Sequence, residues 1–173
     1  DMVFESTILG QREVAKGTHE VTFKRPSTFA FKAGQYMQVA VKELSQSDPK
    51  GASRLFSITS SSYDLEKLSI IFRLSGSGFK ETLRRLPVGA TVRLDQASGS
   101  FLLPQKLAKQ QVFVAGGVGV APFMSYLHQK IDDVWEQPVT LLYGNQNPES
   151  AAYLGELQQM SKQHRKFSLD DIY

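Results

Sequence analysis

The feature that most constrains the fold is a change in hydrophobic pattern near Pro104. Before it, short apolar or alternating runs of strand length are separated by turn residues. After it, apolar runs of strand length alternate with longer segments of helical spacing. The first pattern is typical of a small antiparallel barrel or sandwich, and the second of parallel βαβ units. We therefore expect a β-barrel in residues 1–105 and a parallel α/β unit in residues 106–173.

Both parts can be divided into predicted elements. In the first part, strands are expected at residues 4–15, 19–25, 35–41, 54–60, 67–74 and 91–96. Phe79, Leu83 and Leu86 recur at helical spacing and predict a short helix at 79–86. In the second part, we expect a buried strand at 110–116, a helix at 120–134, a strand at 138–145, a helix at 148–164 and the start of a strand at 165–169.

Composition excludes several classes of function. Lysines and arginines are scattered and the net charge is only +3, which argues against a nucleic-acid partner. Because cysteine is absent, these residues hold no disulfide and no cysteine-ligated cluster, and no metal site is expected. No apolar run reaches the length of a membrane span, and a cytoplasmic location is expected. His19, His128 and His164 show no metal or triad spacing, and His128 is expected at a surface or an interface.

The segment "AGGVGVAPFM" is the strongest candidate for a phosphate site. It places Gly116, Gly117, Val118 and Gly119 between a strand and a helix, with Pro122 in the first helical turn. A helix N-terminus offers free N–H groups, and glycine lets a ligand approach the backbone. A tight β–α turn without a ligand is the alternative. Residues at the end of the next strand would lie at the same sheet edge, where ligands bind in parallel sheets; these are Tyr143, Gly144 and Asn145.

The predicted barrel carries two further candidates. In "SRLFS", Arg54 suits a pyrophosphate, Phe56 can stack on a planar ring system, and Ser57 can hydrogen-bond a ring nitrogen. An ordinary strand with a surface arginine and a core phenylalanine is the alternative. In "RLSGSGFKETL", the N–H groups of Gly78, Phe79 and Lys80 would form a second anion site at a helix start. A glycine-rich hairpin with a packing helix is the alternative there.

Taken in order, these motifs resemble the ferredoxin–NADP reductase superfamily. The resemblance rests on "FKAGQYMQV", "RLFS", "GSGFKETL", "GSF" and "AGGVGVAPFMSYL", and it covers nearly the whole chain. It implies a flavin-binding barrel followed by a nicotinamide-binding α/β domain. It also implies that Ser57 acts beside flavin N5, that Arg54 pairs with a flavin phosphate and that Phe56, where the family more often has tyrosine, packs on the isoalloxazine ring. The remaining implied cofactor-binding residues are Leu55, Phe72, Arg73, Leu74, Gly78, Phe79, Lys80, Gly116, Gly117, Val118, Gly119, Pro122, Tyr143, Gly144 and Asn145.

The family also has a feature that this sequence lacks. Members usually continue to a strand with a Cys-Gly-Pro motif near the nicotinamide, and that motif is absent here. "KFSL" and "DDIY" resemble two family strands that a loop or a helix normally separates. We therefore expect residues to be missing near Leu169 and Asp170 and after Tyr173.

The resemblance implies a flavin-dependent NAD(P)H oxidoreductase. Hydride would pass from NAD(P)H to bound FAD, and electrons would then pass to a protein or small-molecule acceptor that the sequence does not identify. FAD is favoured over FMN because the helix start at Gly78 offers a second phosphate site. NADH is favoured because "YGNQNPES" places no arginine to meet a 2′-phosphate. The alternative is an FAD-binding electron-transfer or redox-sensing subunit without NAD(P)H oxidation; a plain scaffold would require every motif to be accidental.

Overall fold

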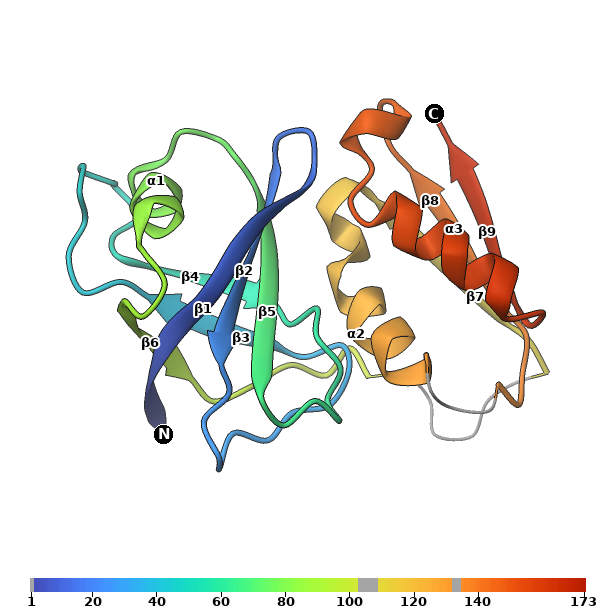
Figure 1. The fold of residues 1–173 in the computed structure, drawn as a ribbon, viewed down its shortest axis with the longest axis horizontal. Helices are drawn as coiled ribbons and strands as arrows, with labels where there is room; N and C mark the ends of the chain where they lie inside the picture. Colours follow the sequence, from blue (N-terminus) through green and yellow to red (C-terminus); the bar gives the residue numbers. More distant parts are fainter. Residues whose placement is uncertain (1, 103–108, 132–134) are drawn as a thin grey trace.

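A computed structural model describes residues 2–102, 109–131 and 135–173. A β-rich part and an α/β part lie side by side, and helix α2 (Ala121–Lys130) lies between the barrel and the second sheet (Figure 1). This confirms the predicted fold class. The expected boundary between residues 105 and 106 and the last three residues of the helix predicted at 120–134 lie outside the described residues.

The first part is a six-stranded antiparallel sheet with the order β4-β3-β6-β1-β2-β5. Its strands are β1 (Val3–Ala15), β2 (Thr18–Lys24), β3 (Tyr36–Ala40), β4 (Ser53–Ser57), β5 (Lys67–Arg73) and β6 (Thr91–Asp95). The two ends of the sheet meet just after β4, where Thr59 N–H donates to Ser69 O over 2.8 Å. That contact curls the sheet into the expected barrel.

The barrel core follows the alternation in the strands. Val21, Phe23, Met37 and Val39 are fully buried, because alternate side chains of a strand point to the same face. Helix α1 (Gly78–Arg85) forms between β5 and β6, where the helical spacing predicted it. Its Phe79 and Leu83 are also fully buried, and Leu86 packs against the same core.

The second part is a parallel sheet with the order β7-β8-β9, made by β7 (Gln111–Gly116), β8 (Val139–Gly144) and β9 (Phe167–Ile172). Helices α2 and α3 (Leu154–Gln163) pack on one face of it. Buried side chains from both helices join those of the strands in one hydrophobic cluster, which includes Leu127, Leu141, Leu157 and Phe167. The expected α/β architecture is therefore present.

Strand β7, predicted as a buried strand, is buried on one face only. Phe113 and Ala115 are buried under the helices, but Val112 and Val114 on the opposite face are 55% and 71% exposed. Among the described residues, no helix covers that face. The strand predicted at 110–116 is therefore present and is buried on one face, because an apolar run does not reveal whether both faces of its sheet are covered.

Two other differences concern the last elements. The helix predicted at 148–164 is divided into the short 3₁₀ helix η2 (Pro148–Ser150) and α3, because Tyr153 adopts a left-handed conformation with φ of 60°. The residues around Leu169 and Asp170 form one continuous strand, β9, in which they pair with Leu141 and Leu142 of β8. The strand whose start was predicted at 165–169 thus extends further, and "KFSL" and "DDIY" contribute to the same strand.

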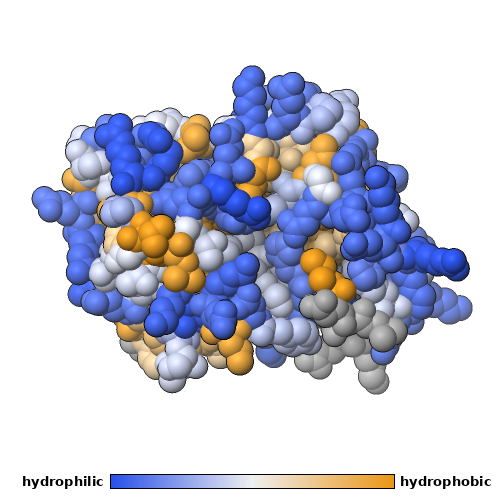
Figure 2. Space-filling model, viewed as in Figure 1, coloured by the Kyte–Doolittle hydropathy of each residue, from blue (hydrophilic) through white to orange (hydrophobic). Residues whose placement is uncertain are grey.

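The surface shows no large apolar area in the view of Figure 2. Hydrophilic side chains dominate this face, and hydrophobic ones form small separate groups. Among the described residues, no helix has the length and hydropathy needed to cross a membrane.

Candidate functional site

The glycine segment forms an open turn at the carboxyl end of β7. β7 ends at Gly116, the 3₁₀ helix η1 (Gly117–Val120) follows, and α2 begins at Ala121 with Pro122 in its first turn. Gly117 has φ of +53°, a conformation that favours glycine. At both Gly117 and Gly119, an added Cβ would have no heavy atom within 4 Å. Packing among the described residues therefore does not explain the glycine at 119, and the backbone of this turn is open to a ligand.

The end of β8 lies directly beside this turn. Gly144 of β8 pairs with Gly116 of β7, so the two strand ends form one edge as predicted. Asn145 is partly buried there, and its N–H donates to Ile172 O over 2.9 Å. The Tyr143 side chain points away from the edge, because it is buried in the core and its hydroxyl donates to Ala152 O over 3.0 Å. Burial raises the pKa of Tyr143 to about 12, and only its backbone is available to a ligand at this edge.

The barrel residues predicted to hold a flavin are gathered around the start of α1. The Phe56 ring stacks on Phe79 with 6.0 Å between centroids, and the Arg54 guanidinium lies 5.3 Å from the Phe79 centroid. Lys80 Nζ lies 5.9 Å from the centroid of Phe72. Phe72 and Phe79 are themselves buried in the barrel core, so a ligand here would meet their backbone rather than their rings.

The start of α1 binds an anionic group, the carboxylate of Asp48. Arg54 Nη2 lies 2.6 Å from Asp48 Oδ1, and Phe79 N–H donates to Asp48 Oδ2 over 2.9 Å. Hydrogen bonds from the N–H groups of Phe79 and Lys50 lower the pKa of Asp48, and Arg54 lowers it further. The same donors can hold a phosphate oxygen, so the residues present fit the phosphate of a flavin nucleotide. The sequence interpretation missed Asp48, because "SDPKG" reads as an ordinary turn.

The other predicted barrel residues differ in exposure. Leu55 is 62% exposed, and Arg73 and Leu74 are exposed at the end of β5. Ser57 ends β4 opposite Tyr36, is partly buried, and its hydroxyl has no hydrogen bond with any described residue. That hydroxyl is therefore available to a ligand.

The segment after Ser57 is attached to the helix that follows the glycine turn. Ser125 Oγ of α2 donates to Ser60 O over 2.7 Å, and His128 Nδ1 lies 2.7 Å from Thr59 O. Ile71 of β5 also packs in the hydrophobic cluster of the α/β part. The strands of the barrel site and the helix of the glycine turn therefore meet at one interface between the two parts.

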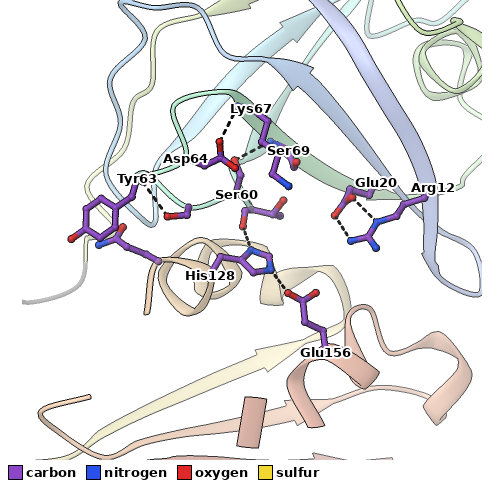
Figure 3. Close-up of a pocket in the computed structure, with 12 residues that line it drawn as sticks. Arg12, Glu20, Ser60, Tyr63, Asp64, Lys67, Ser69, His128 and Glu156 are labelled. Carbon is purple, nitrogen blue, oxygen red and sulfur yellow. Dashed lines mark hydrogen bonds and ion pairs between the residues drawn. The ribbon is translucent and has the colours of Figure 1, made fainter. Parts of the chain in front are cut away.

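A polar cavity of about 450 Å³ lies at this interface. Figure 3 shows His128 reaching from α2 between the barrel and Glu156 of α3, and His128 Nε2 lies 2.6 Å from Glu156 Oε1. Acidic and basic groups line the cavity in similar number, so its charge selects neither anions nor cations; they are Arg12, Glu20, Asp64, Lys67, His128 and Glu156. The described residues contain no cluster of three or more groups that could hold a metal ion.

The sequence did not predict the His128–Glu156 pair. His128 was expected at a surface or an interface, and it lies at an interface. Tyr153 was missed as well: its hydroxyl contacts the buried carboxylate of Glu20, which also pairs with Arg12 at 2.8 Å. No local signal could have found these contacts, because each joins residues on different elements.

The α/β part of the chain matches a known protein family. Residues 113–173 match the family described as "Oxidoreductase NAD-binding domain". Together with the barrel, this match confirms the resemblance to the ferredoxin–NADP reductase superfamily that the order of motifs predicted.

Among particular relatives, the chain is 28% identical to ferredoxin–NADP reductase B of Sorangium cellulosum (strain So ce56), over 92% of this chain and 65% of that protein. It is 27% identical to the toluate 1,2-dioxygenase electron transfer component of Pseudomonas putida, over 95% of this chain and 48% of that protein. The chain thus spans about half to two thirds of the length of these two relatives. The solved ferredoxin-NADP+ reductase from Plasmodium falciparum shares the fold, with a TM-score of 0.85 at 19% identity, over 99% of this chain and 74% of that one.

Proposed function

We propose that this chain is the flavin- and nicotinamide-binding part of an FAD-containing NAD(P)H reductase. The observation that carries the proposal is the joining of the two sites at one interface. The segment after Ser57 is hydrogen-bonded to Ser125 of α2, the helix that the glycine turn precedes. A flavin on the barrel and a nicotinamide at the turn would therefore be neighbours. In this proposal residues 1–105 bind FAD and residues 106–173 bind NAD(P)H.

The residues of the chain have distinct roles in this proposal. Arg54 and the N–H groups at the start of α1 hold the flavin phosphates, and Phe56 supplies an aromatic face. The Ser57 hydroxyl donates a hydrogen bond to the flavin ring. Gly117 and Gly119 admit the dinucleotide phosphates to the N-terminus of α2, with the backbone of Gly144 and Asn145 beside them. The chemistry supplied by bound FAD is acceptance of a hydride and release of electrons to an acceptor.

The acceptor is proposed by analogy with the relatives. One relative is named as the electron transfer component of a dioxygenase and another as a ferredoxin–NADP reductase. We therefore propose a redox protein or an oxygenase component as acceptor. NADH is proposed as the preferred donor because "YGNQNPES" places no arginine to meet a 2′-phosphate, and a cytoplasmic location is proposed from the sequence.

An absorbance titration tests the proposal. The purified protein is incubated with FAD, desalted, and scanned anaerobically before and after addition of NADH and then NADPH. Retained yellow colour that is bleached by one of the two supports the proposal and identifies the donor. Retained flavin that neither nucleotide reduces supports an electron-transfer or sensing subunit instead, and a colourless protein refutes flavin binding.

A further inference from the structure

Part of the loop between β3 and β4 is docked on the start of α1. Ser45 N–H donates to Thr82 Oγ1 over 2.9 Å. A Cβ added to Gly78 would lie 2.5 Å from the carbonyl oxygens of both Gln46 and Ser47. Real Cβ atoms do not approach other atoms so closely, so the loop can lie here only because residue 78 is glycine. Residues 45–48, here called the docked loop, therefore lie directly on the helix start that was expected to receive a phosphate.

The docked loop ends in Asp48, whose carboxylate uses both donors of that site. One oxygen pairs with Arg54 at 2.6 Å and the other accepts from Phe79 N–H at 2.9 Å. The Asp48 side chain is only 3% exposed. A carboxylate held at a helix start by an arginine and a backbone N–H has the same recognition chemistry as a phosphate oxygen.

The charge around Asp48 suits an anion of higher charge. Burial lowers the pKa of Lys80. The nearby positive charges of Arg54 and Lys50 lower it further. Three cationic side chains therefore lie near the start of α1, and one of them, Arg54, pairs with Asp48. A pyrophosphate would balance this cluster better than Asp48 does.

We propose that Asp48 is a built-in competitor of the flavin phosphate, and that the docked loop must leave the start of α1 before FAD can bind fully. The proposal rests on the proposed function and adds a control on cofactor loading to it. The reason is that Arg54 and the Phe79 N–H cannot serve a carboxylate and a phosphate at once. The apparent Kd then equals the intrinsic Kd divided by the fraction of molecules whose loop has left.

The test replaces Asp48 with asparagine, which keeps an oxygen for the Phe79 N–H but removes the charge. Glu43→Gln is the matched control, because it removes the same charge from an exposed position of the loop between β3 and β4, outside the docked loop. Kd values for FAD, FMN and riboflavin are measured from the quenching of flavin fluorescence. We expect Asp48→Asn to bind FAD and FMN roughly tenfold more tightly than the wild type, which corresponds to an open fraction of about one tenth. Riboflavin, which has no phosphate, should bind all three proteins equally.

The sign of the change decides between competition and positioning. If Asp48 merely orients Arg54 for the flavin, Asp48→Asn and Asp48→Ala will bind FAD more weakly, and the proposal is overturned. An equal gain in the Glu43→Gln control would also overturn it, because the effect would then be one of general charge.

A second measurement tests the competition by Asp48 without requiring that the protein binds flavin. Inorganic pyrophosphate is titrated while the backbone amide resonance of Phe79 is followed by NMR. A shift at lower pyrophosphate concentration in Asp48→Asn than in the wild type supports competition at this site, even if no flavin binds. If the Phe79 resonance responds at the same concentration in both proteins, Asp48 does not compete for anions.

Discussion

Replacing His128 with glutamine should remove most of the dependence of stability on pH between neutral and alkaline conditions. Glutamine can still bridge Thr59 O and Glu156, but it does not titrate. Burial lowers the pKa of His128, but the hydrogen bond and the charge of Glu156 outweigh burial, so the pKa is raised above 6.5. A group whose pKa is raised on folding stabilises the folded state below its unfolded pKa, and this contribution is lost as the pH rises through the folded pKa.

The size of the expected loss in the free energy of unfolding follows from the exposure of the His128–Glu156 pair. A hydrogen bond between charged groups contributes about 1.5–3 kcal/mol. The side chains of His128 and Glu156 are 20% and 34% exposed, and solvent screens such a pair. We therefore expect a loss at the low end, about 1.5 kcal/mol, as the imidazolium loses its proton.

Urea unfolding at several pH values measures this effect, with Trp135, the one tryptophan, as the fluorescent reporter of the α/β part. From about pH 6 to about pH 9, the free energy of unfolding of the wild type should fall and that of His128→Gln should stay nearly constant. Glu156→Gln removes the charge that outweighs burial, so the fall in stability above about pH 6 should disappear in this variant as well. Parallel profiles for the wild type and His128→Gln would refute the reasoning.

Three further predictions concern the proposed cofactor sites. Arg54→Ala should weaken FAD binding by roughly ten- to a hundredfold, because a charge-assisted hydrogen bond is lost; unchanged flavin content after dialysis would contradict this. Ser57→Ala should retain FAD but slow its reduction by NAD(P)H in stopped-flow measurements, and equal rates would argue against a role for this hydroxyl. Gly119→Ala should leave the free energy of unfolding within about 0.5 kcal/mol of the wild type, since no atom lies within 4 Å of the added Cβ. The same variant should raise the KM for NAD(P)H, and an unchanged KM would favour a turn without a ligand.

The sequence alone determined the order and type of nearly all elements. Alternation predicted the six strands of the barrel, and the spacing of Phe79, Leu83 and Leu86 predicted α1. The glycines and Pro122 predicted the strand–turn–helix that β7, η1 and α2 form. These features were readable because a strand, a helix or a turn is specified by residues that are close together in the chain.

Only the tertiary structure decided which polar groups of distant elements contact one another. Asp48 meets Phe79 across 31 positions, His128 meets Glu156 across 28, and Tyr153 meets Glu20 across 133. The contact with Glu20 also accompanies the break that divides the predicted helix at Tyr153. At least one partner in each contact is a polar side chain whose own stretch of sequence is equally compatible with a solvated surface. The packing of the barrel against α2 and α3 removes water from Glu20, His128 and Tyr153, and the packing of the β3–β4 loop on α1 does the same at Asp48. A buried charge or hydroxyl must then find a partner from a distant element.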